Sequence, residues 1–204
     1  MVRVMSLTNT KIQCLSIDHG DDPCKEDVLL GVDGELFRGM SNINLNHCCN
    51  AFRSLRDIEI ATHGTDEDGW MTGHLAKILS GATDLEKLSL HGCYGDFPIS
   101  TKYILSTKTW NRLASLNFMY VTVDQAEILD LLRRHSGTLK NIGLYRVRVT
   151  NGSWRIFLEG LKSSLSLRHI SIDGPSDEEG HVFYLNQIAL ENYVLSDGPH
   201  PLSE

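Results

Sequence analysis

One apolar pattern recurs along the chain and constrains its fold more than any other feature. It is clearest in residues 85–93, where LEKLSLHGC reads as L-x-x-L-x-L-x-x-C. The apolar triad of this pattern occurs seven times, and most steps between successive occurrences are 26 to 30 residues long. The triads begin at residues 12, 40, 55, 85, 113, 139 and 167.

A period of this length predicts one strand and one return segment in each unit, and a single such unit cannot bury its own apolar row. The spacing is typical of leucine-rich repeats, whose units run about 20–29 residues. We therefore expect an α/β fold, a leucine-rich-repeat solenoid of the ribonuclease-inhibitor kind, with a curved parallel sheet and helices on its convex side. Residues 1–204 would form this single domain of about seven coils, with a C-terminal cap and tail over 174–204. The strand rows are expected near 12–18, 40–46, 55–61, 85–91, 113–119, 139–145 and 167–173.

The segments between the rows predict helices of uneven quality. Residues 25–37 have mostly helical apolar spacing that Gly31 and Gly34 weaken, which predicts a broken helix, and residues 97–110 predict a looser helix. Asp124 and Ser153 stand where a side chain can accept the free amides of a helix N-terminus, ahead of strongly periodic apolar residues. Asp66 or Asp68 is expected to cap a helix that Gly81 ends. The 15-residue step from row 40 to row 55 is too short for a strand, a helix and a return, so one of these rows is expected to cap a coil without a helix.

The first row begins almost at Met1, and residues 1–11 contain no polar helix or hairpin pattern that would cover it. Each apolar side chain of an uncovered terminal row forgoes roughly 1.5–3 kcal/mol of burial. We therefore expect a truncated chain, a frayed first coil, or a first coil that pairs with another chain.

Composition limits the partners and the compartment. The net charge of −7 argues against nucleic acid or an anionic membrane as the main partner, because both favour clustered Lys and Arg. The five cysteines are odd in number and lie in the N-terminal half, which favours reduced thiols over a disulfide framework. No signal-peptide pattern and no run of about 18 apolar residues is present. We expect a cytoplasmic or nuclear protein.

The last part of the chain contains the segments GTLKNIGL (137–144), VRVTNGSW (147–154) and NYVLSDGPHPL (192–202). On these segments, residues 113–202 resemble the leucine-rich-repeat region of filamentous-fungal F-box proteins, and the resemblance is good over roughly the last 120 residues. It implies the substrate-binding repeats of a ubiquitin-ligase receptor, in which an N-terminal F-box grips a Skp1-type adaptor. The F-box itself is absent ahead of residue 12, so a Skp1-type adaptor is implied only for a longer form that carries one.

The candidate binding surface is the concave face of the predicted sheet. In L-x-x-L-x-L the fourth and sixth residues are buried, and alternation turns the third, fifth and seventh residues toward the concave side. Concave faces are where solenoids bind partners, although such positions must also be polar merely for solubility. The candidate protein-binding residues are Asp57, Glu59, Lys87, Ser89, His91, Ser115, Asn117, Met119, Asn141, Tyr145, His169 and Ser171. The strip also includes Cys14, Ser16, Asp18, Asn42, Asn44, Asn46, Ala61, Gly143 and Asp173.

No motif of a known catalytic or cofactor site is present, so we expect neither an enzyme nor a cofactor nor a small-molecule substrate. Three His-Gly pairs, at 19–20, 63–64 and 91–92, fall at different repeat positions and do not predict a metal site. Acidic residues after the strands, including Asp177, Glu178 and Glu179, are explained by the positive ends of helices. The expected function is protein recognition on the concave face; the alternative is a structural or regulatory solenoid that self-associates or pairs through its uncapped N-terminal repeat.

Overall fold

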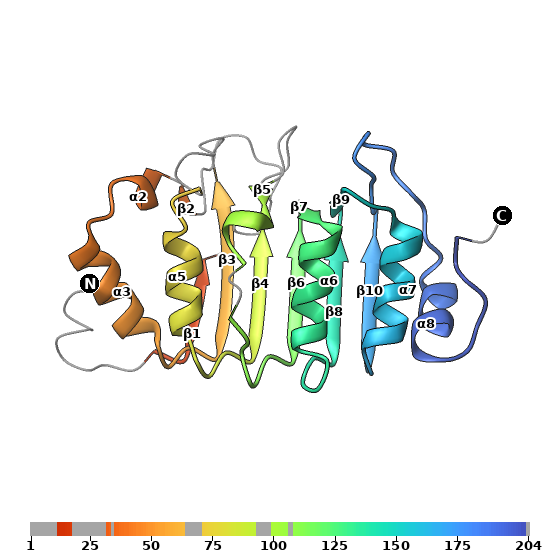
Figure 1. The fold of residues 1–204 in the computed structure, drawn as a ribbon, viewed down its shortest axis with the longest axis horizontal. Coiled ribbons are helices and arrows are strands. Elements are labelled where there is room, and N and C mark those ends of the chain that lie inside the picture. Colours follow the sequence, from red (N-terminus) through yellow and green to blue (C-terminus); the bar gives the residue numbers. More distant parts are fainter. Residues whose placement is uncertain are drawn as a thin grey trace.

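The computed structural model describes residues 12–17, 32–33, 35–63, 71–92, 99–105 and 108–202. It has two parallel sheets and a layer of helices, which confirms the predicted α/β class (Figure 1). The main sheet has the strand order β1-β3-β4-β6-β8-β10, with β2 paired to the end of β3. Its strands are β1 (Cys14–Ile17), β2 (Val32–Asp33), β3 (Asp57–His63), β4 (Lys87–His91), β6 (Ser115–Met119), β8 (Asn141–Tyr145) and β10 (His169–Asp173).

A smaller sheet has the order β5-β7-β9 and lies at the end of the main strands (Figure 1). Its strands are β5 (Ile99–Ser100), β7 (Val121–Asp124) and β9 (Arg148–Thr150). Figure 1 shows α5, α6 and α7 side by side over one face of the main sheet. The helices are α2 (Glu35–Arg38), α3 (Asn42–Phe52), α5 (His74–Gly81), the 3-10 turn η1 (Thr101–Tyr103), α6 (Gln125–Arg134), α7 (Trp154–Ser164) and α8 (Gln187–Leu195).

The core lies between the main sheet and the helices. In β4, Leu88 and Leu90 are buried while the residues between and beside them are not, as the predicted alternation requires. The same two positions are buried in the neighbouring strands, and the parallel register joins them into continuous apolar rows. These rows are Ile58-Leu88-Leu116-Ile142-Ile170 and Ile60-Leu90-Phe118-Leu144-Ile172.

The predicted row at 40–46 is wrong, because these residues lie mainly in helix α3. Ser41 begins the helix by accepting a hydrogen bond from the Asn44 amide at 3.3 Å. Leu45 is buried in the core, whereas Ile43 is 69% exposed. Residues 40, 43 and 45 match the apolar triad by identity, but positions i+3 and i+5 lie about 200° apart on a helix. Of these two positions, only Leu45 therefore faces the core, while Ile43 faces outward. The connection from β1 to β3 is therefore one long segment with β2, α2 and α3 in it.

Two predicted helices also differ from the structure. Within 25–37, the described residues form β2 and α2, and within 97–110 they include strand β5 and the short turn η1. Ser100 accepts the Lys102 amide at 3.3 Å, which starts a tight turn rather than a full helix. Helix α5 begins at His74 after Gly73, which has a φ of 69°, while Asp66 and Asp68 lie outside the described residues.

The last three main strands end in the same sharp turn. Tyr120, Arg146 and Gly174 directly follow β6, β8 and β10, and all three have φ between 50° and 55°. The Tyr120 amide donates to the carbonyl of Tyr145 at 2.9 Å, so the hydrogen-bonded ladder continues into the turn. After β6 and β8 the turn leads into a short strand of the second sheet. The predicted caps Asp124 and Ser153 then start α6 and α7, and both accept helix amides.

Candidate functional site on the open face of the main sheet

The polar residues of the main strands form three ladders on the sheet face that lies away from α5, α6 and α7. We call this surface the sheet face. The parallel register places all twelve candidate binding residues in these ladders. The ladders are Asp57-Lys87-Ser115-Asn141-His169, Glu59-Ser89-Asn117-Gly143-Ser171 and Ala61-His91-Met119-Tyr145-Asp173. Sequence alternation therefore gave their relative positions correctly, while their use in binding stays a prediction.

On β3 and β4, the charged groups of the sheet face pair with one another. Lys87 Nζ lies 3.2 Å from Asp57 Oδ2, and His91 Nε2 lies 3.8 Å from Glu59 Oε1. Ser16 of the neighbouring β1 donates a hydrogen bond to Glu59 Oε2 at 2.9 Å. These pairs are partly exposed, and such pairs contribute little to stability, typically about 0–1 kcal/mol each. Both carboxylates of this part of the face therefore have a polar partner.

On β6 and β8, the ladder residues are uncharged, and all except the buried Gly143 are half-buried. They include Asn117, Met119 and Tyr145. Gly143 is the one position of the five-strand middle ladder without a side chain, and Asn117 and Tyr145 fill its space. A Cβ at Gly143 would overlap Asn117 Oδ1 and would come within 3.0 Å of Tyr145 Cε2. The sequence analysis did not predict this arrangement. The feature of the sequence that could have indicated it is the glycine at a ladder position where the other strands have polar residues.

The turn after the ladders adds an aromatic and a cationic group that the sequence analysis did not select. The Arg146 guanidinium carbon lies 5.8 Å from the centre of the Tyr120 ring. Such a cation–π contact is worth about 0.5–1 kcal/mol at exposed sites. It joins two neighbouring coils at the rim of the sheet face.

Other residues of the predicted strip lie elsewhere. Asn42, Asn44 and Asn46 are on α3 and not on the sheet, and Asp18 falls outside the described residues.

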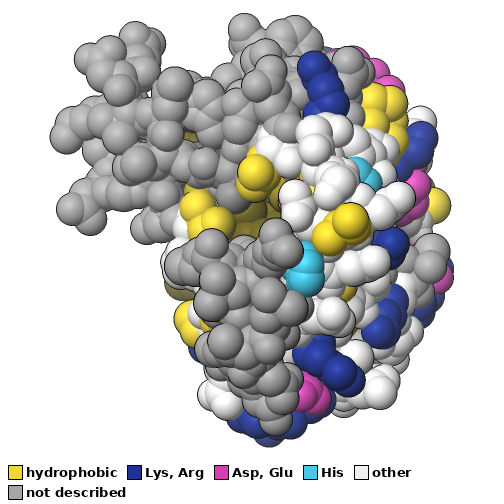
Figure 2. Space-filling model, turned by 90° about the vertical axis from the view of Figure 1, so that its left-hand side faces the viewer, with side chains coloured by type: hydrophobic (Ala, Val, Ile, Leu, Met, Phe, Trp, Pro, Cys, Tyr) yellow, Lys and Arg dark blue, Asp and Glu magenta, His cyan; other side chains and the backbone are white. Residues whose placement is uncertain are grey.

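Figure 2 views the molecule from the left of Figure 1, which is the end at which α2 and α3 lie. Most of the Lys and Arg side chains visible in this view gather in its lower half.

The cysteines do not form a recognisable site among the described residues. Cys48 and Cys49 are on α3, and burial raises the pKa of both thiols. Buried thiols of raised pKa are less reactive at neutral pH, because the thiolate is the nucleophile and the metal ligand. Cys14 is exposed on β1, and Cys24 and Cys93 lie outside the described residues.

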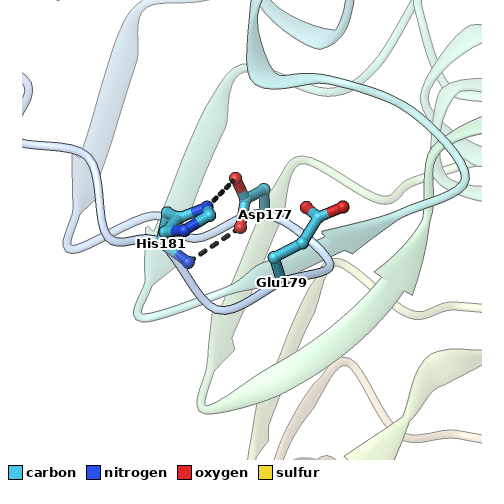
Figure 3. Close-up of side chains that lie close together, drawn as sticks. All are labelled: Asp177, Glu179 and His181. Carbon is cyan, nitrogen blue, oxygen red and sulfur yellow. Dashed lines mark hydrogen bonds and ion pairs between the residues drawn. The ribbon is translucent and has the colours of Figure 1, made fainter.

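Asp177, Glu179 and His181 form a small cluster in the loop after β10, with possible metal-ligand atoms all within 4.8 Å of one another (Figure 3). The Asp177 carboxylate already accepts hydrogen bonds from the His181 amide at 2.8 Å and from its ring at 3.0 Å. Desolvation by itself would raise the pKa of Asp177, but these hydrogen bonds act in the opposite direction and the pKa is lowered. The cluster thus braces a turn, and it does not lie at the start of a helix as the sequence analysis expected.

No protein-family model, no curated protein and no solved structure matches this chain. Within the described ranges, each helix is too short or too polar to cross a membrane. The sheet face and its ladders are therefore the observations on which a function can be argued.

Proposed function

We propose that this chain is a leucine-rich-repeat solenoid that recognises a protein partner on its sheet face, which is the concave face, and acts by binding without catalysis. The observation that carries this proposal is the register of the twelve candidate residues, which forms one continuous surface across five strands. A preformed parallel sheet offers a large rigid surface at little ordering cost on binding.

The uncharged part of the sheet face on β6 and β8 is the centre of the proposed contact. Met119 and Tyr145 are residue types enriched at protein interfaces, and both are half-buried here, so part of each side chain remains available. The paired charges on β3 and β4 form the rim of the contact. Because rim pairs are solvated, they contribute orientation more than affinity.

The proposed role is that of the substrate-binding repeats of an F-box receptor. The chain holds the target, and a Skp1-type adaptor joins only in a longer form that carries an F-box. The site of action is the cytoplasm or the nucleus, and the partner is a protein and not nucleic acid or a membrane. Co-purification of a Skp1-type adaptor with this chain alone would contradict this division of roles.

The test compares proteins captured by the wild type and by matched variants, quantified by mass spectrometry. Asn117→Arg and Tyr145→Ala alter the sheet face, whereas Asn46→Arg on the exposed side of α3 and Tyr184→Ala, at a side chain 95% exposed beyond β10, are the controls. The sheet-face variants should lose proteins that the wild type and both controls retain. An unchanged set of captured proteins would show that this face is not the binding surface.

A second candidate function rests on the edge strand β1. Among the described residues, no strand pairs with the side of β1 that faces away from β3, and Leu15 and Ile17 are only partly buried. An open edge is a template for pairing with another chain. Self-association through β1 predicts a dimer in sedimentation that Ser16→Pro weakens, whereas a monomer at all concentrations excludes this function.

A further inference from the structure

We infer that the sheet face binds its partner as an extended peptide segment, and that the side-chain amide of Asn117 pairs with the backbone of that segment. This inference rests on the proposed function and specifies the kind of partner that the same surface accepts. It is carried by the placement of Asn117 over Gly143.

Asn117 lies in the middle ladder, directly between Ser89 on β4 and Gly143 on β8. Its amide oxygen occupies the space in which a Cβ of residue 143 would stand, and the Tyr145 ring borders the same space. The amide therefore leans across β8 near the middle of the sheet face. Any side chain at 143 would push it away.

The Asn117 amide has no hydrogen-bond partner among the described residues, unlike the other half-buried side-chain amide near the end of the sheet. Gln187 uses its amide fully, since it donates to Ile170 O and Glu191 Oε1 and accepts from the Ile172 amide. Asn117 is thus a displayed donor and acceptor near the centre of the sheet face, over the space left by Gly143.

One side-chain amide offers a donor and an acceptor side by side, which matches the C=O and N–H of one residue in an extended chain. The neighbours on the face are uncharged: Ser89 and Ser171 in the same ladder, and Met119 and Tyr145 beside it. Met packs against varied shapes, and Tyr provides rigid contact area. The fitting occupant is an extended segment with an uncharged residue at this point.

The probe is a set of linear peptides selected from a displayed random library on the wild-type chain, then synthesised with a fluorophore for anisotropy titration. Asn117→Asp keeps the size of the side chain and removes its donor, and it should weaken binding about tenfold, the usual range for one hydrogen bond and a lost partner. Gly143→Ala should weaken binding similarly, because it displaces the amide. The flexible end of Asn117 can move, so the fold should remain, as checked by circular dichroism and urea midpoint.

Asn46→Asp is the matched control, because it makes the same change on the exposed side of α3, away from the sheet. Its affinity should equal that of the wild type. A scan of singly N-methylated peptides then locates the contact. One methylated position, whose N–H donates to Asn117 Oδ1, should weaken wild-type binding about tenfold and should weaken binding to Asn117→Ala no further, because this truncation already removes the acceptor.

The inference is overturned if the selected peptides bind Asn117→Asp and Gly143→Ala as tightly as the wild type, if the effects of N-methylation and of Asn117→Ala add, or if selection yields no peptide. Loss of protein capture in Tyr145→Ala together with any of these results would leave the proposed function standing. Unchanged capture in every sheet-face variant would overturn both.

Discussion

In the C-terminal region, residues 108–202, two main strands are followed by the same series of elements. Among the described residues of 12–63, strands β1 and β3 are joined by a single connection of different elements. In the C-terminal region β6 and β8 are each followed by a turn of positive φ, a short second strand, a side-chain cap and a helix. Between β1 and β3 a single connection holds β2, α2 and α3. Both regions contribute strands to the same sheet. Only in the C-terminal region do two neighbouring strands, β6 and β8, lead into corresponding short strands and helices.

Equivalent parts allow polar contacts between neighbouring coils of the C-terminal region. Asn151 donates to Asp124 Oδ2 at 2.8 Å, and the Ser153 amide donates to Gln125 Oε1 at 2.6 Å, so the start of α7 is tied to the start of α6. In the N-terminal region the corresponding tie is a contact of His74 Nδ1 with Phe37 O at 2.8 Å. The starts of α6 and α7 are therefore held together by side-chain hydrogen bonds in addition to the apolar core.

The two regions should respond alike to loss of a buried leucine if they unfold together. Leu158 in α7 is 0% exposed and Leu45 in α3 is 1% exposed, so replacing either by Ala should cost about 2–5 kcal/mol of unfolding free energy. Ile43→Ala, at a side chain 69% exposed, should change it by less than about 0.5 kcal/mol. Urea unfolding followed by circular dichroism measures all three. A cost below about 1 kcal/mol for Leu45→Ala alone would show that α3 is not part of the cooperative core.

A buried histidine should make the regular region sensitive to acid. His135 is 2% exposed; its Nε2 accepts from the Trp110 amide at 2.9 Å, and its Nδ1 donates to Leu131 O at 2.7 Å. The contact at Nε2 requires the neutral ring, because a protonated Nε2 cannot accept, whereas Nδ1–H donates in either form. Burial lowers the pKa of His135, with a further lowering by the charge of Arg134, against the opposing bond to Leu131.

Because the folded pKa lies below the usual value of 6.5, the unfolded state binds more protons in that interval. Stability that is present above pH 6.5 should therefore fall as pH drops below 6.5 toward the folded pKa. His135→Gln should cost about 1–3 kcal/mol at neutral pH and should flatten this part of the pH profile. Unfolding midpoints at a series of pH values test it, and an equally steep profile in the variant would assign the acid sensitivity to other groups.

The sequence predicted the strands of the C-terminal region better than the elements of the N-terminal region. The rows that begin at 85, 113, 139 and 167 could be placed because equal steps and strict alternation leave a strand as the simple solution. Row 40 failed because residues 42–52 form a helix capped by Ser41, on which Ile43 faces outward and Leu45 faces the core, so matching the apolar triad by identity was misleading. Ladder membership followed from alternation, whereas the lean of Asn117 over Gly143 depends on side-chain geometry across two strands, which spacing alone does not encode.

The far edge of the sheet should depend on one side chain. Gln187 of α8 donates to Ile170 O at 2.5 Å and accepts from the Ile172 amide at 3.4 Å, so it pairs with the outer edge of β10 as a strand would. Gln187→Ala should cost about 1–2 kcal/mol and should favour edge-to-edge association. Urea unfolding and sedimentation velocity measure the two effects. Gln187→Glu should cost at least as much, because its carboxylate would face the acceptors Ile170 O and Glu191 Oε1. An unchanged Gln187→Ala variant would show that α8 closes this edge by apolar packing alone.

The smallest expected effect concerns the tie between α6 and α7. Asp124 accepts from the amides of Ala126 and Glu127 and from Asn151, and the Asn151 bond is the main cause that lowers the pKa of Asp124. The contribution of this carboxylate is therefore present above its ordinary value of 3.8 and is lost as pH falls through the folded pKa.

Asn151→Gly removes the side chain but tolerates the φ of 52°, so it should raise the pKa of Asp124 and cost about 0.5–1 kcal/mol at neutral pH. A carboxyl-carbon NMR titration reports the pKa directly, and Asp177, which is bonded to His181 instead, is the internal control that should not move. Because the bond joins corresponding positions of neighbouring coils, the variant should also loosen α7 in hydrogen exchange while leaving α3 unchanged. An Asp124 pKa that stays low in Asn151→Gly would mean that the helix amides alone hold the carboxylate, and that the coils keep their register through the apolar rows without this tie.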